Sequence, residues 1–264
     1  MAIVALQLVG LMINNALTTN VRDANGGDIS VTSQTKPFTQ SDLTKFDTLK
    51  SNGTITNFTP IISSTGSTGN SASIRNNFTI EAVDPGSFPL VTPPTFITPA
   101  AGKISTLLVN NHVIVDKTFA DQYSKKVGDT LTVHVGTSTG GSERILSITI
   151  AGIVSDSGAL AQSSGVMLIS NQDFNAAAKT VPVFYDTIDV TTVDQAHTDQ
   201  AVKAIQAQFP IASTQTAADA LKSQQSLTDS IKKFLEIAGL LALLIGGIGI
   251  VNTMQVLLSR RKTE

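Results

Sequence analysis

Apolar residues recur along the middle of the chain with two periods, which predict alternating strands and helices. Apolar residues at every second position, or in a short continuous run, predict strands. These strands fall within residues 28–33, 54–62, 74–84, 113–116, 130–135, 144–154, 166–170, 184–192 and 210–214. Polar stretches of low complexity separate several of them. The sequence predicts loops at 63–73 and 155–165, and a hairpin connection at 136–143.

Helical spacing appears first within residues 39–53. Thr39 and Asp42 there form an acidic variant of the capping box, and Gly53 suits the end of the helix. Three apolar residues at three-residue steps would form its buried face: Leu43, Phe46 and Leu49. This segment is therefore predicted to be a helix with one face in the core.

Two further helices are predicted in the second half of the domain. Residues 194–209 carry Ala201, Ile205 and Phe209 at four-residue steps. A shorter helix is expected over 171–178, with Asn171 as its N-cap. The order of strands and helices predicts an α+β fold, in which one open-faced sandwich carries an inserted, strand-rich unit.

The last predicted helix is far longer than the others. Thr216 and Asp219 form its capping pair. No Pro follows, and no Gly occurs until Gly239, so one helix is expected from Ala217 to Leu258.

Residues 237–259 of this helix carry no charge over 23 positions. At ~1.5 Å per residue they span about 35 Å, which is enough for the ~30 Å hydrocarbon core of a bilayer. The alternative is a buried helix of a soluble protein. Arg260, Arg261 and Lys262 follow at once, and the positive-inside bias predicts that this end is cytoplasmic.

Small residues are ordered within the charge-free segment. Ala238, Ala242 and Gly246 recur every four positions, and Gly249 with Thr253 repeats the spacing on a neighbouring face. Such a stripe lets a second helix approach closely. Asn252 and Thr253 are polar, and an interhelical hydrogen bond is their expected role. These six residues are predicted to form a helix-packing site.

The chain begins with about 13 apolar residues, MAIVALQLVGLMI, which are too few to span a bilayer. They also lack the positive region and the cleavage site of a signal peptide. Residues 1–20 are predicted to be part of a first transmembrane helix. The alternative is an N-terminal helix buried in a soluble domain.

Composition narrows the function classes. The formal net charge is -2, so the basic excess that nucleic-acid binding requires is missing. The chain contains no Cys, which excludes disulfides and thiolate metal sites.

No catalytic, cofactor-binding or metal-ligating set stands out, and we expect no enzyme activity. His112, His134 and His197 are far apart and are assigned surface or packing roles. Four carboxylates could in principle form a site, but turn formation explains Asp84 beside Pro and Asp129 after Gly. The four are Asp84, Asp116, Asp121 and Asp129.

Four stretches together resemble the FtsX-like permeases of the MacB type. Residues 240–264, LLALLIGGIGIVNTMQVLLSRRKTE, are similar to the second transmembrane helix of that family. Residues 78–103 resemble the segment around its Val-Asp-Pro, although Ala82 stands where Gly is usual. Residues 125–133 and 148–158 resemble its Val-Gly-Asp turn and the strand that follows.

The resemblance implies a membrane permease subunit of an ABC-type export or mechanotransmission complex. Members form dimers and work with a separate or fused ATPase, whose ATP hydrolysis moves the outer domain. The expected partners are therefore a cognate ABC ATPase, a second permease copy and the cytoplasmic membrane. An extracytoplasmic substrate such as a peptide, an antibiotic or a lipoprotein is also implied, and no nucleic acid.

The resemblance also implies a domain plan in which transmembrane helices flank the extracytoplasmic domain. Family members have four such helices, and this sequence shows nothing similar to the third and fourth. A porter-like extracytoplasmic βαβ subdomain would comprise 21–109 and 181–215, with a small α/β subdomain inserted at 110–180. A stalk helix (216–236), a transmembrane helix (237–259) and the start of a cytoplasmic segment (260–264) would follow.

Two other functions stay open from the sequence. The chain could be a membrane-tethered extracytoplasmic sensor or binding domain, set between two helices as in receptor kinases. It could also be a division-type relative that regulates cell-wall hydrolases through a protein partner.

Overall fold

The structure is a computed structural model of the 264-residue chain. It describes residues 21–261 except 34, 69–76, 136–143, 161–163 and 178–182, and it leaves out most side chains after residue 241. Residues 20–220 form one compact unit, and the described residues from 221 onward belong to a second.

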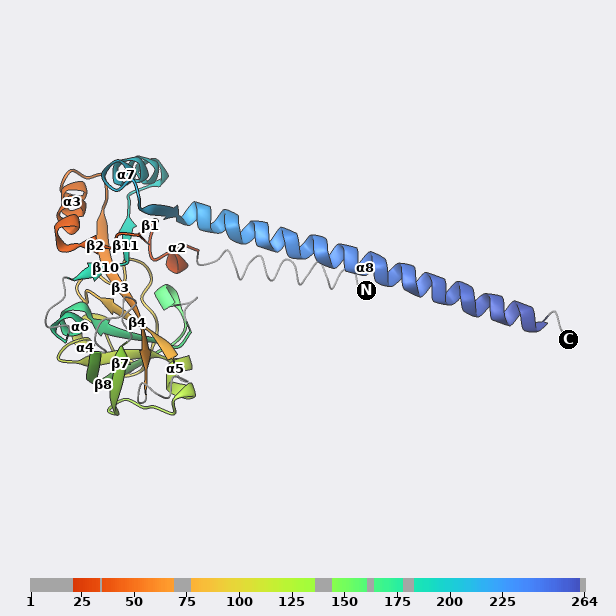
Figure 1. Ribbon diagram of the computed structural model, residues 1–264, viewed down its shortest axis with the longest axis horizontal. Helices are drawn as coiled ribbons and strands as arrows, with labels where there is room; N and C mark the ends of the chain where they lie inside the picture. The colour runs from red at the N-terminus through yellow and green to blue at the C-terminus, as the bar shows by residue number, and fades with distance from the viewer. Residues whose placement is uncertain are drawn as a thin grey trace. The chain divides into compact units, whose positions relative to one another are not determined.

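Ten strands of the compact unit form one continuous sheet (Figure 1). Its order is β12 (Ser213–Thr216), β1 (Ile29–Thr32), β11 (Thr187–Thr191), β3 (Asn57–Ser67), β4 (Asn77–Val83), β9 (Val166–Ser170), β6 (His112–Asp116), β8 (Arg144–Val154) and β5 (Phe96–Thr98), with β7 (Thr130–Val135) paired to β3 and β8. A separate pair joins β10 (Phe184–Tyr185) to β2 (Phe38–Thr39).

Helices connect these strands and cover them. They are α2 (Val21–Ala24), α3 (Gln40–Ser51), α4 (Ile104–Leu107), α5 (Lys117–Gln122), α6 (Asn171–Ala176), α7 (Gln195–Gln208) and α8 (Ala217–Arg261), with a 3-10 turn, η1 (Gly158–Leu160). The mixed content confirms the predicted α+β class.

At one end the sheet is antiparallel, through β12, β1, β11 and β3. Its apolar face, which includes Ile29 and Val190, is fully buried. Figure 1 shows α3 and α7 next to each other at this end. Phe46 of α3 stacks on Phe209, which follows α7, with ring centroids 5.2 Å apart. The predicted buried faces of both helices are confirmed.

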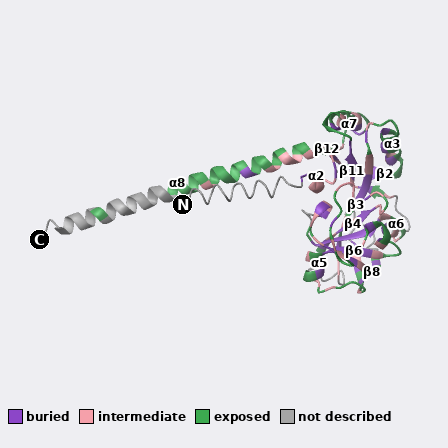
Figure 2. Ribbon diagram, turned by 180° about the vertical axis from the view of Figure 1, so that it is seen from behind, coloured by how far each residue is buried: buried purple, intermediate pink, exposed green. Residues whose placement is uncertain are grey.

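At the other end the sheet closes on itself. β3 pairs with β4, then β9, β6, β8 and β7 follow, and β7 pairs back to β3. Closure removes free strand edges. Side chains from these strands fill one buried cluster, and Figure 2 shows the buried strands. In β6, Val113 and Val115 pack into this cluster, whereas Ile114 packs into a second cluster with Leu168.

β3 links the two ends because it is 11 residues long. Asn57–Ile61 pair with β11, Ile61–Ser67 pair with β4, and Gly66 and Ser67 pair with β7. The sheet is therefore continuous where the sequence predicts the boundary of an inserted subdomain. The division at 110–180 stays a prediction.

Three local predictions are wrong. The loop expected from Ser63 is strand as far as Ser67, because cross-strand pairing overrides a polar composition. The strand expected at 210–214 begins at Ser213, because Phe209–Ala212 form a turn. Ser170, and not Asn171, caps α6: its hydroxyl accepts a hydrogen bond from the Gln172 amide at 3.2 Å. The predicted hairpin connection, 136–143, lies outside the described residues.

α8 is one uninterrupted helix of 45 residues, about 68 Å long at ~1.5 Å per residue. This confirms the single long helix predicted from Ala217. Among the residues that the structure describes, no helix has both the length and the hydropathy of a membrane span. The predicted span, 237–259, falls largely on side chains outside that part, and residues 1–20 lie wholly outside it. Both stay sequence predictions.

Candidate functional site

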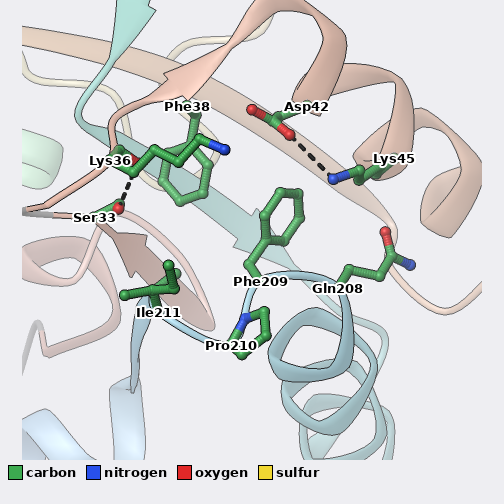
Figure 3. Close-up of a pocket in the computed structure, with 10 residues that line it drawn as sticks. Ser33, Lys36, Phe38, Asp42, Lys45, Gln208, Phe209, Pro210 and Ile211 are labelled. Carbon is green, nitrogen blue, oxygen red and sulfur yellow. Dashed lines mark hydrogen bonds and ion pairs between the residues drawn. The ribbon is translucent and has the colours of Figure 1, made fainter.

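A cleft of about 140 Å³ lies between the start of α3 and the end of α7 (Figure 3). The segment before β2, the first turns of α3 and the turn after α7 form its walls. The lining residues are Ser33, Lys36, Phe38, Asp42, Lys45, Gln208, Phe209, Pro210, Ile211 and Ala212.

The floor of the cleft is aromatic. Phe38 and Phe209 meet edge to face, with ring centroids 5.4 Å apart at 88°. Both rings are nearly fully buried, at 2% and 9% exposure. Ile211 at the rim is 69% exposed. The cleft therefore runs from the apolar core to one exposed apolar side chain, that of Ile211.

The walls carry more positive than negative charge. Lys45 Nζ lies 3.1 Å from Asp42 Oδ1 and 4.5 Å from the centre of the Phe209 ring. Asp42 Oδ2 also accepts hydrogen bonds from the amide and hydroxyl of Thr39, which confirms the predicted capping pair. Burial acts to raise the pKa of Asp42, but the hydrogen bonds from Thr39 and Lys45 hold it below its ordinary value.

The start of α8 is fixed by a second set of hydrogen bonds. Thr216 and Asp219 form a complete capping box: each backbone amide donates to the other's side chain, at 3.2 and 3.0 Å. The Ala217 amide donates to the Asp28 carbonyl at 3.0 Å. The Asp28 carboxylate in turn accepts from Arg22, at 2.7 Å, and from the Thr192 amide, at 2.8 Å. The first turn of α8 is thus held to the sheet.

All six predicted helix-packing residues lie on α8. Ala238 is exposed. The side chains of the other five lie outside the described part of the chain: Ala242, Gly246, Gly249, Asn252 and Thr253. The structure therefore does not test the packing stripe, which stays a prediction.

The histidines and the four carboxylates named above form no common cluster among the described residues. His112 contacts the Val109 carbonyl, and His197 contacts the Asp194 carboxylate, each at 2.7 Å. Asp84 and Asp129 each accept hydrogen bonds from nearby turn residues, as expected. Within the described ranges, no group of three or more His, Asp or Glu is placed to hold a metal ion.

The remaining two carboxylates have local roles. Asp116 is fully buried and caps α5 by accepting from the Phe119 amide at 2.7 Å. It also accepts from the Val166 amide at 3.1 Å. Asp121 is paired with Lys117 on the surface of the same helix.

The buried carboxylate of Asp189 has no local sequence signal. This residue is 5% exposed, and burial raises its pKa to about 7, with nearby Glu81 acting in the same direction and a hydrogen bond from Ser30 opposing it. Gly26 packs directly on this carboxyl group. The cleft likewise has no local sequence signal, because it joins residues more than 160 positions apart in the chain.

The continuous sheet, the helices between its strands and its closed barrel define an α+β protein. Its sequence then assigns the family: the chain belongs to the MacB-like periplasmic core domain family, whose model matches residues 1–208. The predicted resemblance is confirmed over that range. No curated protein sequence matches the chain.

Solved structures of similar proteins come from transporters. The periplasmic region of MacB from Actinobacillus actinomycetemcomitans is 12% identical, with a TM-score of 0.46, and the match covers 82% of this chain and 96% of that one. The extracellular domain of the noncanonic ABC-type transporter YknZ from Gram-positive bacteria is also 12% identical, with a TM-score of 0.45. That match covers 71% of this chain and 99% of the other.

Proposed function

We propose that this chain belongs to a permease subunit of an ABC-type export or mechanotransmission complex. In this proposal, ATP hydrolysis by a partner ATPase on the cytoplasmic side moves the extracytoplasmic domain through α8. Family membership supports the class of protein. The chain acts as a transmitter of movement and carries out no covalent chemistry.

The observation that carries the proposal is the direct join between β12 and α8. β12 ends at Thr216 and α8 begins at Ala217, with no loop between them. β12 is paired with β1 over four residues, from Ile29↔Thr216 to Thr32↔Ser213. A displacement of the helix start therefore acts on the sheet itself, because a flexible linker that could absorb it is missing at this join.

A second copy of the chain is the proposed partner along α8. Leu227, Ile231 and Phe234 follow one another at steps of four and three, and their exposed fractions are 65%, 48% and 69%. This spacing continues to Ala238 and Leu241, which are also exposed. A stripe with steps of four and three is the seam by which two helices pack in a coiled coil.

The test breaks the join in the full-length permease with its ATPase. Gly-Ser-Gly is inserted between Thr216 and Ala217, and a spin label is placed at the exposed Lys203 of both copies. We expect the distance between the labels to change with ATP in the parent protein and to stop changing in the insertion variant. The same insertion after Gly53, where the added residues meet open space, is the matched control and should keep the change.

Two results would contradict the proposal. A nucleotide-dependent distance that survives insertion at the join would show that α8 does not transmit the movement. A distance that never responds to nucleotide, in a complex that hydrolyses ATP, would favour the tethered sensor instead.

A further inference from the structure

Lys36 lines the cleft, and none of the residues that the structure describes forms an ion pair with it. Its side chain crosses Phe38 towards the centre of the cleft (Figure 3). Among the described residues, no ion pair or hydrogen bond engages its ammonium group, whereas Lys45 is paired with Asp42. The cleft walls thus hold two cations and one anion, and an anionic group would complete the charge balance.

The size of the cleft limits what can enter. Sites for whole drug-sized ligands have volumes of roughly 300–1,000 Å³. This cleft, at about 140 Å³, has room for one apolar side chain and a small polar group beside it. The cleft ends at the edge-to-face rings of Phe38 and Phe209, which offer dispersion contacts but no hydrogen bonds to an aliphatic group.

We propose that the cleft between α3 and α7 binds the C-terminus of a peptide whose last residue is apolar. The last side chain packs between the aromatic floor and Ile211. The terminal carboxylate lies beside Lys36, whose ammonium group can donate hydrogen bonds to it. Binding of a C-terminal carboxylate is an established mode of peptide recognition.

This inference goes beyond the proposed function, because transmission through α8 does not require an occupied cleft. A failed binding test would leave the coupling experiment unaffected. A failed coupling experiment would likewise leave the binding test unaffected.

The test uses isothermal titration of the full chain in lipid nanodiscs, which avoid free detergent. The probe is acetyl-Gly-Gly-Leu with a free carboxylate, compared with the same peptide as its C-terminal amide, with acetyl-Gly-Gly-Gly and with decanoate. We expect saturable binding of the first peptide. The amide and the Gly peptide should each bind at least about tenfold more weakly. The amide lacks the terminal carboxylate, and the Gly peptide lacks the apolar side chain.

Three variants locate the site. Lys36→Gln should weaken the acid peptide about tenfold and leave the amide unchanged. Ile211→Ser should weaken the Leu peptide and leave the Gly peptide unchanged. Lys203→Gln, which removes an exposed charge from α7 outside the cleft, is the matched control and should change nothing.

Each contrary result overturns the proposal. These are the absence of saturable binding, equal binding of acid and amide, and binding that Lys36→Gln and Ile211→Ser leave intact. Binding of decanoate in preference to the peptide would also overturn it, and would assign the cleft to fatty acids instead.

Discussion

The backbone amide of Ala217, the first residue of α8, donates a hydrogen bond to the carbonyl of Asp28, 3.0 Å away. Asp28 comes directly before β1, and its carboxylate is also bound by Arg22 and by the Thr192 amide. One residue therefore ties α8, α2 and the end of β11 together. Its side chain holds α2 and the end of β11, whereas its backbone carbonyl holds the first residue of α8.

Asp28→Ala should lower the free energy of unfolding by about 1–3 kcal/mol, because the Thr192 amide loses a charged acceptor. The backbone amide of Thr192 should exchange faster with solvent, whereas the Ala217 amide keeps its acceptor, the Asp28 backbone carbonyl. Thermal denaturation and amide hydrogen exchange measure these effects. Asp121→Ala, which removes an exposed surface pair, is the control and should change stability by less than about 1 kcal/mol. Equal stability in the two variants would argue against a central role for Asp28.

Asp189→Asn should change how stability depends on pH. The unfolded chain has an Asp pKa of about 3.9, whereas the folded pKa is about 7. The folded state therefore holds the proton more tightly. This contribution to stability is complete below about pH 4 and is lost as the pH rises through about 7.

Asn cannot ionise but keeps the shape of the protonated acid. The variant should therefore be more stable than the parent at pH 8, by up to about 4 kcal/mol, and should match it near pH 4. Urea denaturation at a series of pH values measures this difference. Asp121→Asn, at an exposed carboxylate, serves as the control. A constant difference across the pH range would mean that Asp189 does not titrate as described.

Gly66→Ala should destabilise the barrel. A Cβ atom at this buried position would lie 2.6 Å from Ile80 Cδ1 and from the Phe78 ring, so both side chains must move. Overpacking of this kind costs about 1–3 kcal/mol. Thr65→Ala, at the exposed neighbouring position of β3, should cost less than about 1 kcal/mol and is the control. Stability equal to the parent protein would show that the barrel interior has room to spare.

Gly246→Leu should uncouple ATP hydrolysis in the full permease complex if the predicted small-residue stripe packs against another helix. A large side chain prevents the close approach that Ala238, Ala242 and Gly246 would permit. The measurement is the ATPase rate with and without the permease bound. Leu244→Ile, two positions away and thus on the opposite side of the helix, is the volume-conserving control. Unchanged coupling in Gly246→Leu would contradict the stripe.

The longer helices α3, α7 and α8 are predictable from local patterns in the sequence. Leu43, Phe46 and Leu49 define the buried face of α3 by spacing alone, and Thr216 with Asp219 marks the start of α8. These features depend on residues within a few positions of one another, so a local pattern is sufficient to predict them. The same holds for the length of α8, because a long stretch without Pro has no residue to end it.

The extent of the strands and their pairing depend on tertiary contacts. β3 continues through polar Ser63–Ser67 because β4 and β7 supply hydrogen-bond partners from elsewhere in the chain, and this pairing closes the barrel. The buried Asp189, the tie between Asp28 and Ala217, and the cleft between Lys36 and Ile211 arise in the same way. Each depends on contacts between residues far apart in sequence, which the spacing of apolar and polar positions does not encode.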